Sequence, residues 1–117
     1  MKKIDLGQSV SVLANVGVLI GILLLAYELN QNRDMMRSQA RNAIADTLVN
    51  ILYQRATSPY LAEILAKLEA GEQLTAVETI RFLEMQAAEW RYRENVNYQY
   101  RNDLYDEGEY LAQRRGV

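Results

Sequence analysis

The 117-residue sequence contains no cysteine and no histidine. Without cysteine the chain forms no disulfide, and it offers no thiolate to an iron–sulfur cluster or a zinc ion. Without histidine it lacks the commonest metal ligand, the usual general base and the usual axial ligand of haem. These absences exclude much of the familiar chemistry of enzymes, and we expect neither a cofactor nor a catalytic residue.

An excess of charge of one sign is also missing. Thirteen basic residues are interspersed with fifteen acidic ones, and the formal net charge is −2. Proteins that grip the phosphate backbone of DNA or RNA carry clustered lysine and arginine. No such cluster occurs here, so we expect no nucleic-acid partner.

One long apolar run, from Val12 to Leu29, dominates the sequence. Its only uncharged polar interruption is Asn15, and its only charged residue is Glu28. About 18 to 20 such residues in a helix cross a hydrocarbon core of roughly 30 Å. The run therefore predicts a transmembrane helix over residues 9–29, after an N-terminal tail of residues 1–8. We expect membrane lipids to surround it.

Two other interpretations of this run are weaker. A cleaved signal peptide has a shorter apolar region and ends in a small-x-small pattern, which Ala26-Tyr27-Glu28 does not supply. A buried core helix would need more surrounding chain than this sequence provides. The three arginines after the run outnumber Lys2 and Lys3 before it, which favours a cytoplasmic C-terminal part.

The rest of the chain predicts helices and no strands. Residues 30–57 show an amphipathic pattern, with Ala40, Ile44 and Leu48 on one face. Capping signals then divide residues 58–117 into three helices: Pro59 to about Ala70 before Gly71, Ala76 to about Asp103 after a Thr75/Glu78 capping box, and a short last helix through Arg114. We expect an all-α fold in which the transmembrane helix extends into a membrane-proximal helical hairpin or small bundle.

The transmembrane run carries a possible association motif. Gly17 and Gly21 are four residues apart, a spacing that lets a second helix approach closely. Asn15 lies nearby in the run, and its amide would gain from a hydrogen-bond partner on a neighbouring helix. These residues predict helix association within the membrane, whereas the alternative is a lone anchor whose asparagine is wetted at the surface.

A basic stripe follows the run. Arg33, Arg37 and Arg41 repeat every four residues and project to nearly the same side of a helix. They are either a solvated stripe beside the membrane or a contact with anionic lipid headgroups, where each basic residue contributes about 1 kcal/mol.

The predicted helix from Ala76 is apolar on two sides. One side carries Ile80, Leu83, Ala87, Trp90, Tyr98 and Tyr105, and the other carries Phe82, Met85, Tyr92, Val96 and Tyr100. A helix that is apolar on two sides is sandwiched between partners. We expect one side to pack within the molecule and the other to meet a second protomer or another protein, unless its tyrosines merely tolerate water.

A polar cluster interrupts the first of these sides. Glu94 lies three residues after Arg91, four before Tyr98 and seven before Arg101. This spacing favours a carboxylate held by guanidinium and phenol donors. The cluster has no nucleophile beside a base, so it indicates a structural network rather than an active site. Four glutamates of this helix superficially suggest a di-metal bundle, but such bundles need Glu-x-x-His motifs.

Two blocks of sequence resemble a group of small bacterial proteins of unknown function. The first runs from about Val16 to Ile44 and includes Ala-Tyr-Glu-Leu-Asn-Gln-Asn-Arg; the second, about Trp90 to Arg115, includes Glu-Asn-Val-Asn-Tyr-Gln-Tyr-Arg. The resemblance implies a single-span helical protein of the bacterial inner membrane and brings no established reaction. It also draws attention to Asn30, Asn32, Glu94, Asn95, Tyr98, Tyr100 and Arg101.

The sequence thus predicts a non-catalytic, membrane-anchored interaction or accessory subunit of a membrane protein assembly. Its partner would be a second copy or another membrane protein. The first alternative is a small-ligand-binding protein or enzyme that uses Arg91, Glu94, Tyr98 and Arg101. The second alternative is an anionic-lipid sensor that uses the arginine stripe.

Overall fold

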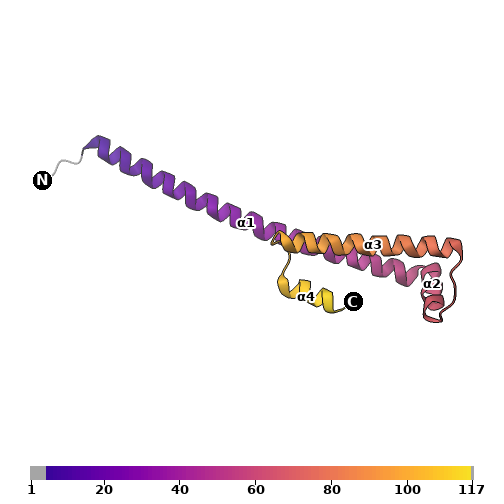
Figure 1. The fold of residues 1–117 in the computed structure, drawn as a ribbon. Coiled ribbons are helices and arrows are strands. Elements are labelled where there is room, and N and C mark those ends of the chain that lie inside the picture. Colours follow the sequence, from indigo (N-terminus) through magenta and orange to yellow (C-terminus); the bar gives the residue numbers. More distant parts are fainter. Residues whose placement is uncertain (1–4, 117) are drawn as a thin grey trace. The chain divides into compact units, whose positions relative to one another are not determined.

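The computed structural model describes residues 5–116, and every regular element within that range is a helix. The predicted all-α fold, with a long apolar N-terminal helix followed by shorter packed helices, is confirmed. The four helices of the described range are α1 (Leu6–Thr57), α2 (Pro59–Glu69), α3 (Ala76–Arg101) and α4 (Glu107–Arg115) (Figure 1).

Helix α1 begins three residues earlier than the predicted span. The Asp5 carboxylate accepts a hydrogen bond from the Gly7 amide at 3.2 Å, and the Asp5 carbonyl accepts the first helical bond. Within the predicted tail of residues 1–8, Leu6 to Gln8 are therefore helical, and residues 1–4 lie outside the described range. The polar sequence at residues 30–32 continues the helix without a break.

The chain divides into two compact units, one ending at Met36 and the other beginning at Arg37. The first unit contains the apolar part of α1, which is long and apolar enough to cross a membrane by length and composition. None of its most apolar 18-residue window is buried inside the molecule, whereas the core helix of a soluble protein would be mostly buried. The core-helix interpretation therefore lacks the covering residues it requires.

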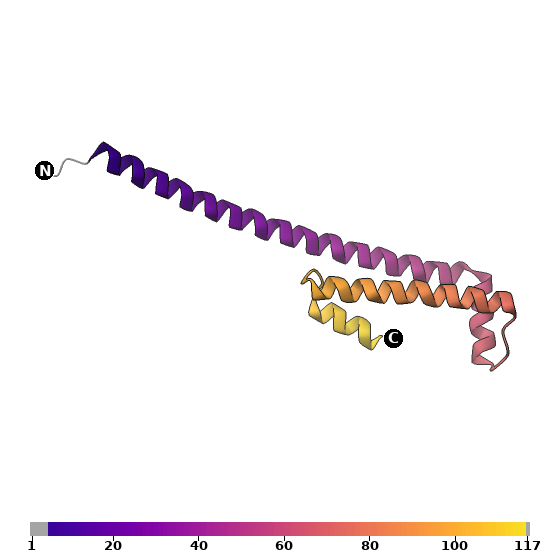
Figure 2. The same ribbon diagram turned by 45° about the horizontal axis from the view of Figure 1, so that its top comes forward.

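The second unit is a helical hairpin with two short additions. Residues 37–57 of α1 and helix α3 run side by side in opposite directions (Figures 1 and 2). The Arg37 Nε donates a hydrogen bond to the Asp103 carbonyl at 2.8 Å, and Arg55 forms an ion pair with Glu89. Because the residue numbers rise along α1 while they fall along α3, these contacts define an antiparallel pair. Helix α2 crosses the pair at the end where α1 stops and α3 begins. Helix α4 folds back beside α3.

A small core holds this unit together. It follows the predicted amphipathic face of residues 30–57 and one of the two predicted apolar sides of α3. The core comprises Ala40 and Ile44 from α1, Ile64 from α2, and Met85 and Val96 from α3. Burial of the four larger side chains stabilises each by roughly 1.5–3 kcal/mol relative to exposure, and burial of the Ala40 methyl group contributes less. The predicted inward side of α3 is therefore the one that contains Met85 and Val96.

Local signals set the path between α2 and α3. The Ser58 hydroxyl accepts the Leu61 amide at the start of α2, with Pro59 at the first helical position. At the end of α2, Gly71 has φ +70°, a backbone conformation that is open to glycine without strain. The Glu72 amide bonds the Lys67 carbonyl at 2.9 Å, which closes the last turn.

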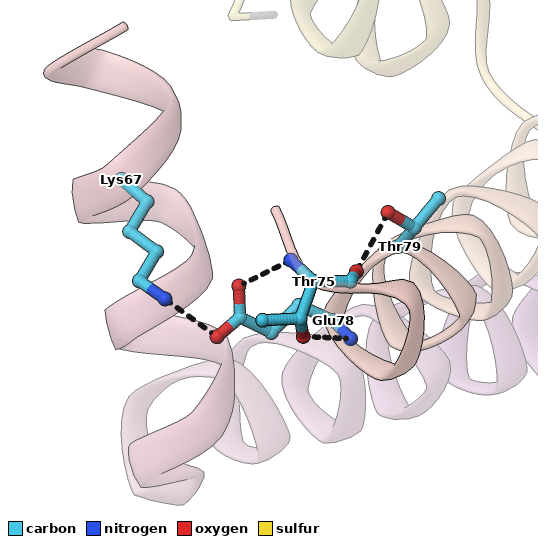
Figure 3. Close-up of polar contacts among 4 residues, drawn as sticks. All are labelled: Lys67, Thr75, Glu78 and Thr79. Atoms are coloured by element: carbon cyan, nitrogen blue, oxygen red, sulfur yellow. Dashed lines mark hydrogen bonds and ion pairs between the residues drawn. The ribbon is translucent and has the colours of Figure 1, made fainter. Parts of the chain in front are cut away.

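The predicted capping box begins α3 (Figure 3). The Thr75 hydroxyl accepts the Glu78 amide, and the Glu78 carboxylate accepts the Thr75 amide, each at 3.2 Å. The same carboxylate binds the Lys67 ammonium at 2.7 Å. One side chain thereby caps α3 and ties it to α2.

This arrangement predicts a loss of stability in acid. The hydrogen bond from Lys67 and then the Thr75 amide hold the pKa of Glu78 below its ordinary value of 4.5. A carboxyl whose pKa is lowered by folding stabilises the fold above its unfolded pKa, and this contribution is lost as the pH falls through the folded pKa. We expect the urea midpoint, followed by circular dichroism, to fall below pH 4.5. Glu78→Gln should remove part of this dependence and Glu84→Gln, on the same helix, should not; identical profiles for Glu78→Gln and the natural protein would contradict it.

Candidate interaction site

The outward side of α3 is an apolar surface without a partner in the described part of the chain. Its large side chains each keep more than half of their accessible surface, and they recur at helical spacing. They are Val77, Ile80, Leu83, Trp90 and Tyr98. Several large apolar side chains exposed along one side of a helix are typical of an interaction site. We call these five residues the outward face of α3.

The Glu94 carboxylate sits within the outward face and is bound by its own helix. The Trp90 indole Nε1 donates to one oxygen at 3.0 Å, and the Arg91 guanidinium pairs with the other at 3.1 Å. Within the described residues, neither Tyr98 nor Arg101 bonds to this carboxylate. The indole therefore takes the place that the sequence assigned to a phenol, because it lies one turn before Glu94 and its N–H reaches the carboxylate.

The geometry of this cluster favours positioning over chemistry. The Glu94 side chain is half exposed and that of Arg91 is 83% exposed, so water screens their attraction. An exposed pair three residues apart on a helix contributes about 0.2–0.5 kcal/mol. Its clearest effect is to hold the Trp90 indole through its N–H, which limits the rotation of an exposed side chain.

Asn95 and Tyr100, to which the resemblance also draws attention, make other contacts. Asn95 accepts a hydrogen bond from the Gln99 side chain at 3.4 Å. The Tyr100 ring stacks on the Tyr110 ring of α4, with centroids 4.1 Å apart and planes 2° from parallel. The nearby Glu107 carboxylate, with burial, raises the pKa of the Tyr100 phenol. Tyr100 is thus a packing residue that holds α4 against α3.

A chain of phenols and amides joins α3 to α4, and sequence reasoning did not find it. Tyr92 donates to the Gln113 side-chain oxygen at 2.9 Å, and the Gln113 amide donates to the Tyr105 hydroxyl at 2.8 Å. Tyr110 donates to Asn97 at 3.2 Å. Burial raises the pKa of both Tyr92 and Tyr105. The available signal was the spacing of Tyr110 and Gln113, which places both on one face of α4.

The glycine pair of α1 is open in the described molecule. A methyl group built on Gly17 or Gly21 would meet no atom within 4 Å, so nothing in the chain itself requires glycine there. Asn15 is two positions from Gly17, and helical geometry turns its side chain about 200° away from that glycine. The glycines and the asparagine therefore belong to different sides of the helix.

Two arginines of the basic stripe bind acceptors of the chain itself. Arg37 donates to the Asp103 carbonyl, and the Arg41 Nε pairs with the Glu109 carboxylate of α4 at 2.8 Å. The Arg41 side chain remains 69% exposed. Arg33 is exposed on α1. Contact of the stripe with lipid headgroups stays a prediction. In the structure, Arg37 and Arg41 also bind the turn between α3 and α4 and the start of α4.

Comparison of the chain with protein-family models, with curated proteins and with solved structures found no match. The resemblance to small bacterial membrane proteins stays a prediction. The function is therefore inferred from the surfaces described above.

Proposed function

We propose that this chain is a non-catalytic, single-pass membrane protein that serves as an interaction subunit of a membrane protein assembly. The outward face of α3 is the observation that carries the proposal, because five large apolar side chains there lack cover while Met85 and Val96 of the same helix are buried. Surface of this composition gains free energy when a partner covers it. The apolar part of α1 is the anchor, in a bacterial inner membrane with the C-terminal part in the cytoplasm.

The outward face is tested by chemical labelling in the native membrane. Because the natural chain has no cysteine, a single substituted cysteine reports on one position alone. We expect Leu83→Cys, on the outward face, to react with a maleimide several-fold more slowly than Asn50→Cys, which is exposed on α1. The difference should vanish when detergent separates the assembly. Equal rates in the membrane would show that the face has no partner.

The glycine pair predicts a second contact, within the membrane. Replacing Gly17 and Gly21 with isoleucine is expected to lower the crosslinked fraction of the protein several-fold, because bulky side chains keep a second helix from close approach. The open space around both glycines means that the chain itself tolerates the change. Ala26→Ile, a similar enlargement on the opposite side of the helix, is the control. An unchanged crosslinked fraction in the glycine variant would limit α1 to the role of an anchor.

A further inference from the structure

A hollow between α3 and α4 has features that the proposed function does not use. It has a volume of about 440 Å³, within the range of roughly 300–1,000 Å³ that is typical of small-molecule sites. The Trp90 and Tyr110 side chains line it together with Val96, which gives it an apolar wall. This wall accommodates a flat or apolar chemical group.

Two arginines give the hollow an unbalanced positive charge. Arg93 of α3 and Arg114 of α4 both line it, and neither has a carboxylate partner among residues 5–116, although the Arg114 guanidinium lies over the Tyr110 ring at 5.9 Å from its centroid. By contrast, Arg37, Arg41 and Arg55 each bind an oxygen acceptor.

The one acidic residue of the lining does not balance this charge. Glu94 is already paired with Arg91 and accepts from the Trp90 indole. The two lining guanidiniums are thus left to neutralise an anion from outside the chain. Guanidinium groups bind carboxylate and phosphate with paired, charge-assisted hydrogen bonds.

The walls of the hollow are held in place before any ligand arrives. Tyr110 is fixed by its stack on Tyr100 and by its hydrogen bond to Asn97. Gln113 is fixed between Tyr92 and Tyr105. A site whose side chains are already ordered loses less entropy on binding, which favours affinity for a small ligand.

We propose that this hollow binds a small organic anion, in which a phosphate or carboxylate group is attached to an apolar or aromatic body. Arg93 and Arg114 hold the charged group, and Trp90, Val96 and the edge of the Tyr110 ring contact the body. The ligand is either a free metabolite or a lipid headgroup, since both carry this chemistry. Trp90 belongs both to the hollow and to the outward face, whereas Arg93, Tyr110 and Arg114 belong to the hollow alone.

The single tryptophan of the chain makes the test direct, because Trp90 lines the hollow and is the only source of indole emission, and the arginine variants separate a ligand in the hollow from a partner on the outward face. The full chain in a neutral detergent is titrated with phenyl phosphate, with benzoate and with uncharged phenol. We expect a saturable change in Trp90 emission with the two anions and none with phenol. A second arm compares nanodiscs of phosphatidylcholine alone with nanodiscs that also contain phosphatidylglycerol.

Variants separate the site from general surface charge. We expect Arg93→Gln and Arg114→Gln each to weaken binding by about tenfold or more, as the loss of a charge-assisted hydrogen bond predicts. Arg101→Gln and Arg115→Gln, on the same two helices but outside the lining, should change it less than about twofold.

The two arms assign the source of the ligand. A response to the soluble anions that requires Arg93 and Arg114 indicates a free ligand, and one confined to the anionic nanodiscs indicates a lipid headgroup. The proposal is overturned if neither arm responds, if phenol binds as well as phenyl phosphate, or if the response persists in both arginine variants.

Discussion

Replacing Ile64 with alanine is expected to remove a large part of the stability of the second unit. Ile64 is 1% exposed, and it is the only buried residue that α2 contributes to the core within residues 5–116. Truncation of such a side chain costs about 2–5 kcal/mol because a cavity remains. A unit of this size has a total stability of only roughly 5–10 kcal/mol.

The neighbouring leucine supplies the control for this prediction. Leu65 lies on the same helix but is 39% exposed, so Leu65→Ala should cost far less. The measurement is urea unfolding of the full chain in mild detergent, followed by circular dichroism. Equal midpoints for the two variants would show that α2 is not anchored by Ile64 and that the core described above is wrong.

Removal of the Glu89 carboxylate alone should have the second largest effect. Glu89 on α3 pairs with Arg55 near the end of α1, and the two side chains are 18% and 33% exposed. Glu89→Leu leaves the Arg55 guanidinium without its counter-charge in a half-buried position. Such an unsatisfied charged group costs about 1–3 kcal/mol. The same urea experiment measures this loss.

The double variant distinguishes a broken pair from lost packing. The Arg55 Nε is buried and has no hydrogen-bond partner within residues 5–116, so the native pair is itself incompletely satisfied. We therefore expect Arg55→Leu combined with Glu89→Leu to recover most of the stability lost by Glu89→Leu alone. The exposed Arg91–Glu94 pair is the matched comparison, and Glu94→Leu should cost less than about 0.5 kcal/mol. Additive losses in the double variant would contradict this account of the pair.

The helical architecture was predictable from the sequence because its signals are local. Ser58 and Pro59, then Gly71, then Thr75 and Glu78 mark helix ends through contacts that span only a few residues. The spacing of apolar residues also identified the buried face of residues 37–57 and the two apolar sides of α3, but not which of those two sides is buried. Such signals fix where helices begin and end and which faces are apolar, whereas the packing of the helices decides which apolar face is covered.

Contacts between helices were not predictable in the same way. The bonds from Gln113 to Tyr92 and Tyr105, and the Arg41–Glu109 ion pair, join residues whose proximity depends on how α4 folds back. No local pattern encodes that path. Around Glu94, helical spacing suggested Tyr98 and Arg101 as donors to the carboxylate. In the structure the Trp90 indole, one turn earlier, donates to it instead. Several donors compete at similar spacing, and only side-chain geometry decides among them.

The native mass of the full chain, extracted gently from its membrane, tests the proposed function most directly. The single chain has a mass of 13.4 kDa. Our account predicts a particle that contains several copies or other polypeptides, and a shift to smaller mass when Gly17 and Gly21 are replaced with isoleucine. A particle that contains one chain alone, at every gentle extraction condition, would contradict the proposal that this protein is an interaction subunit.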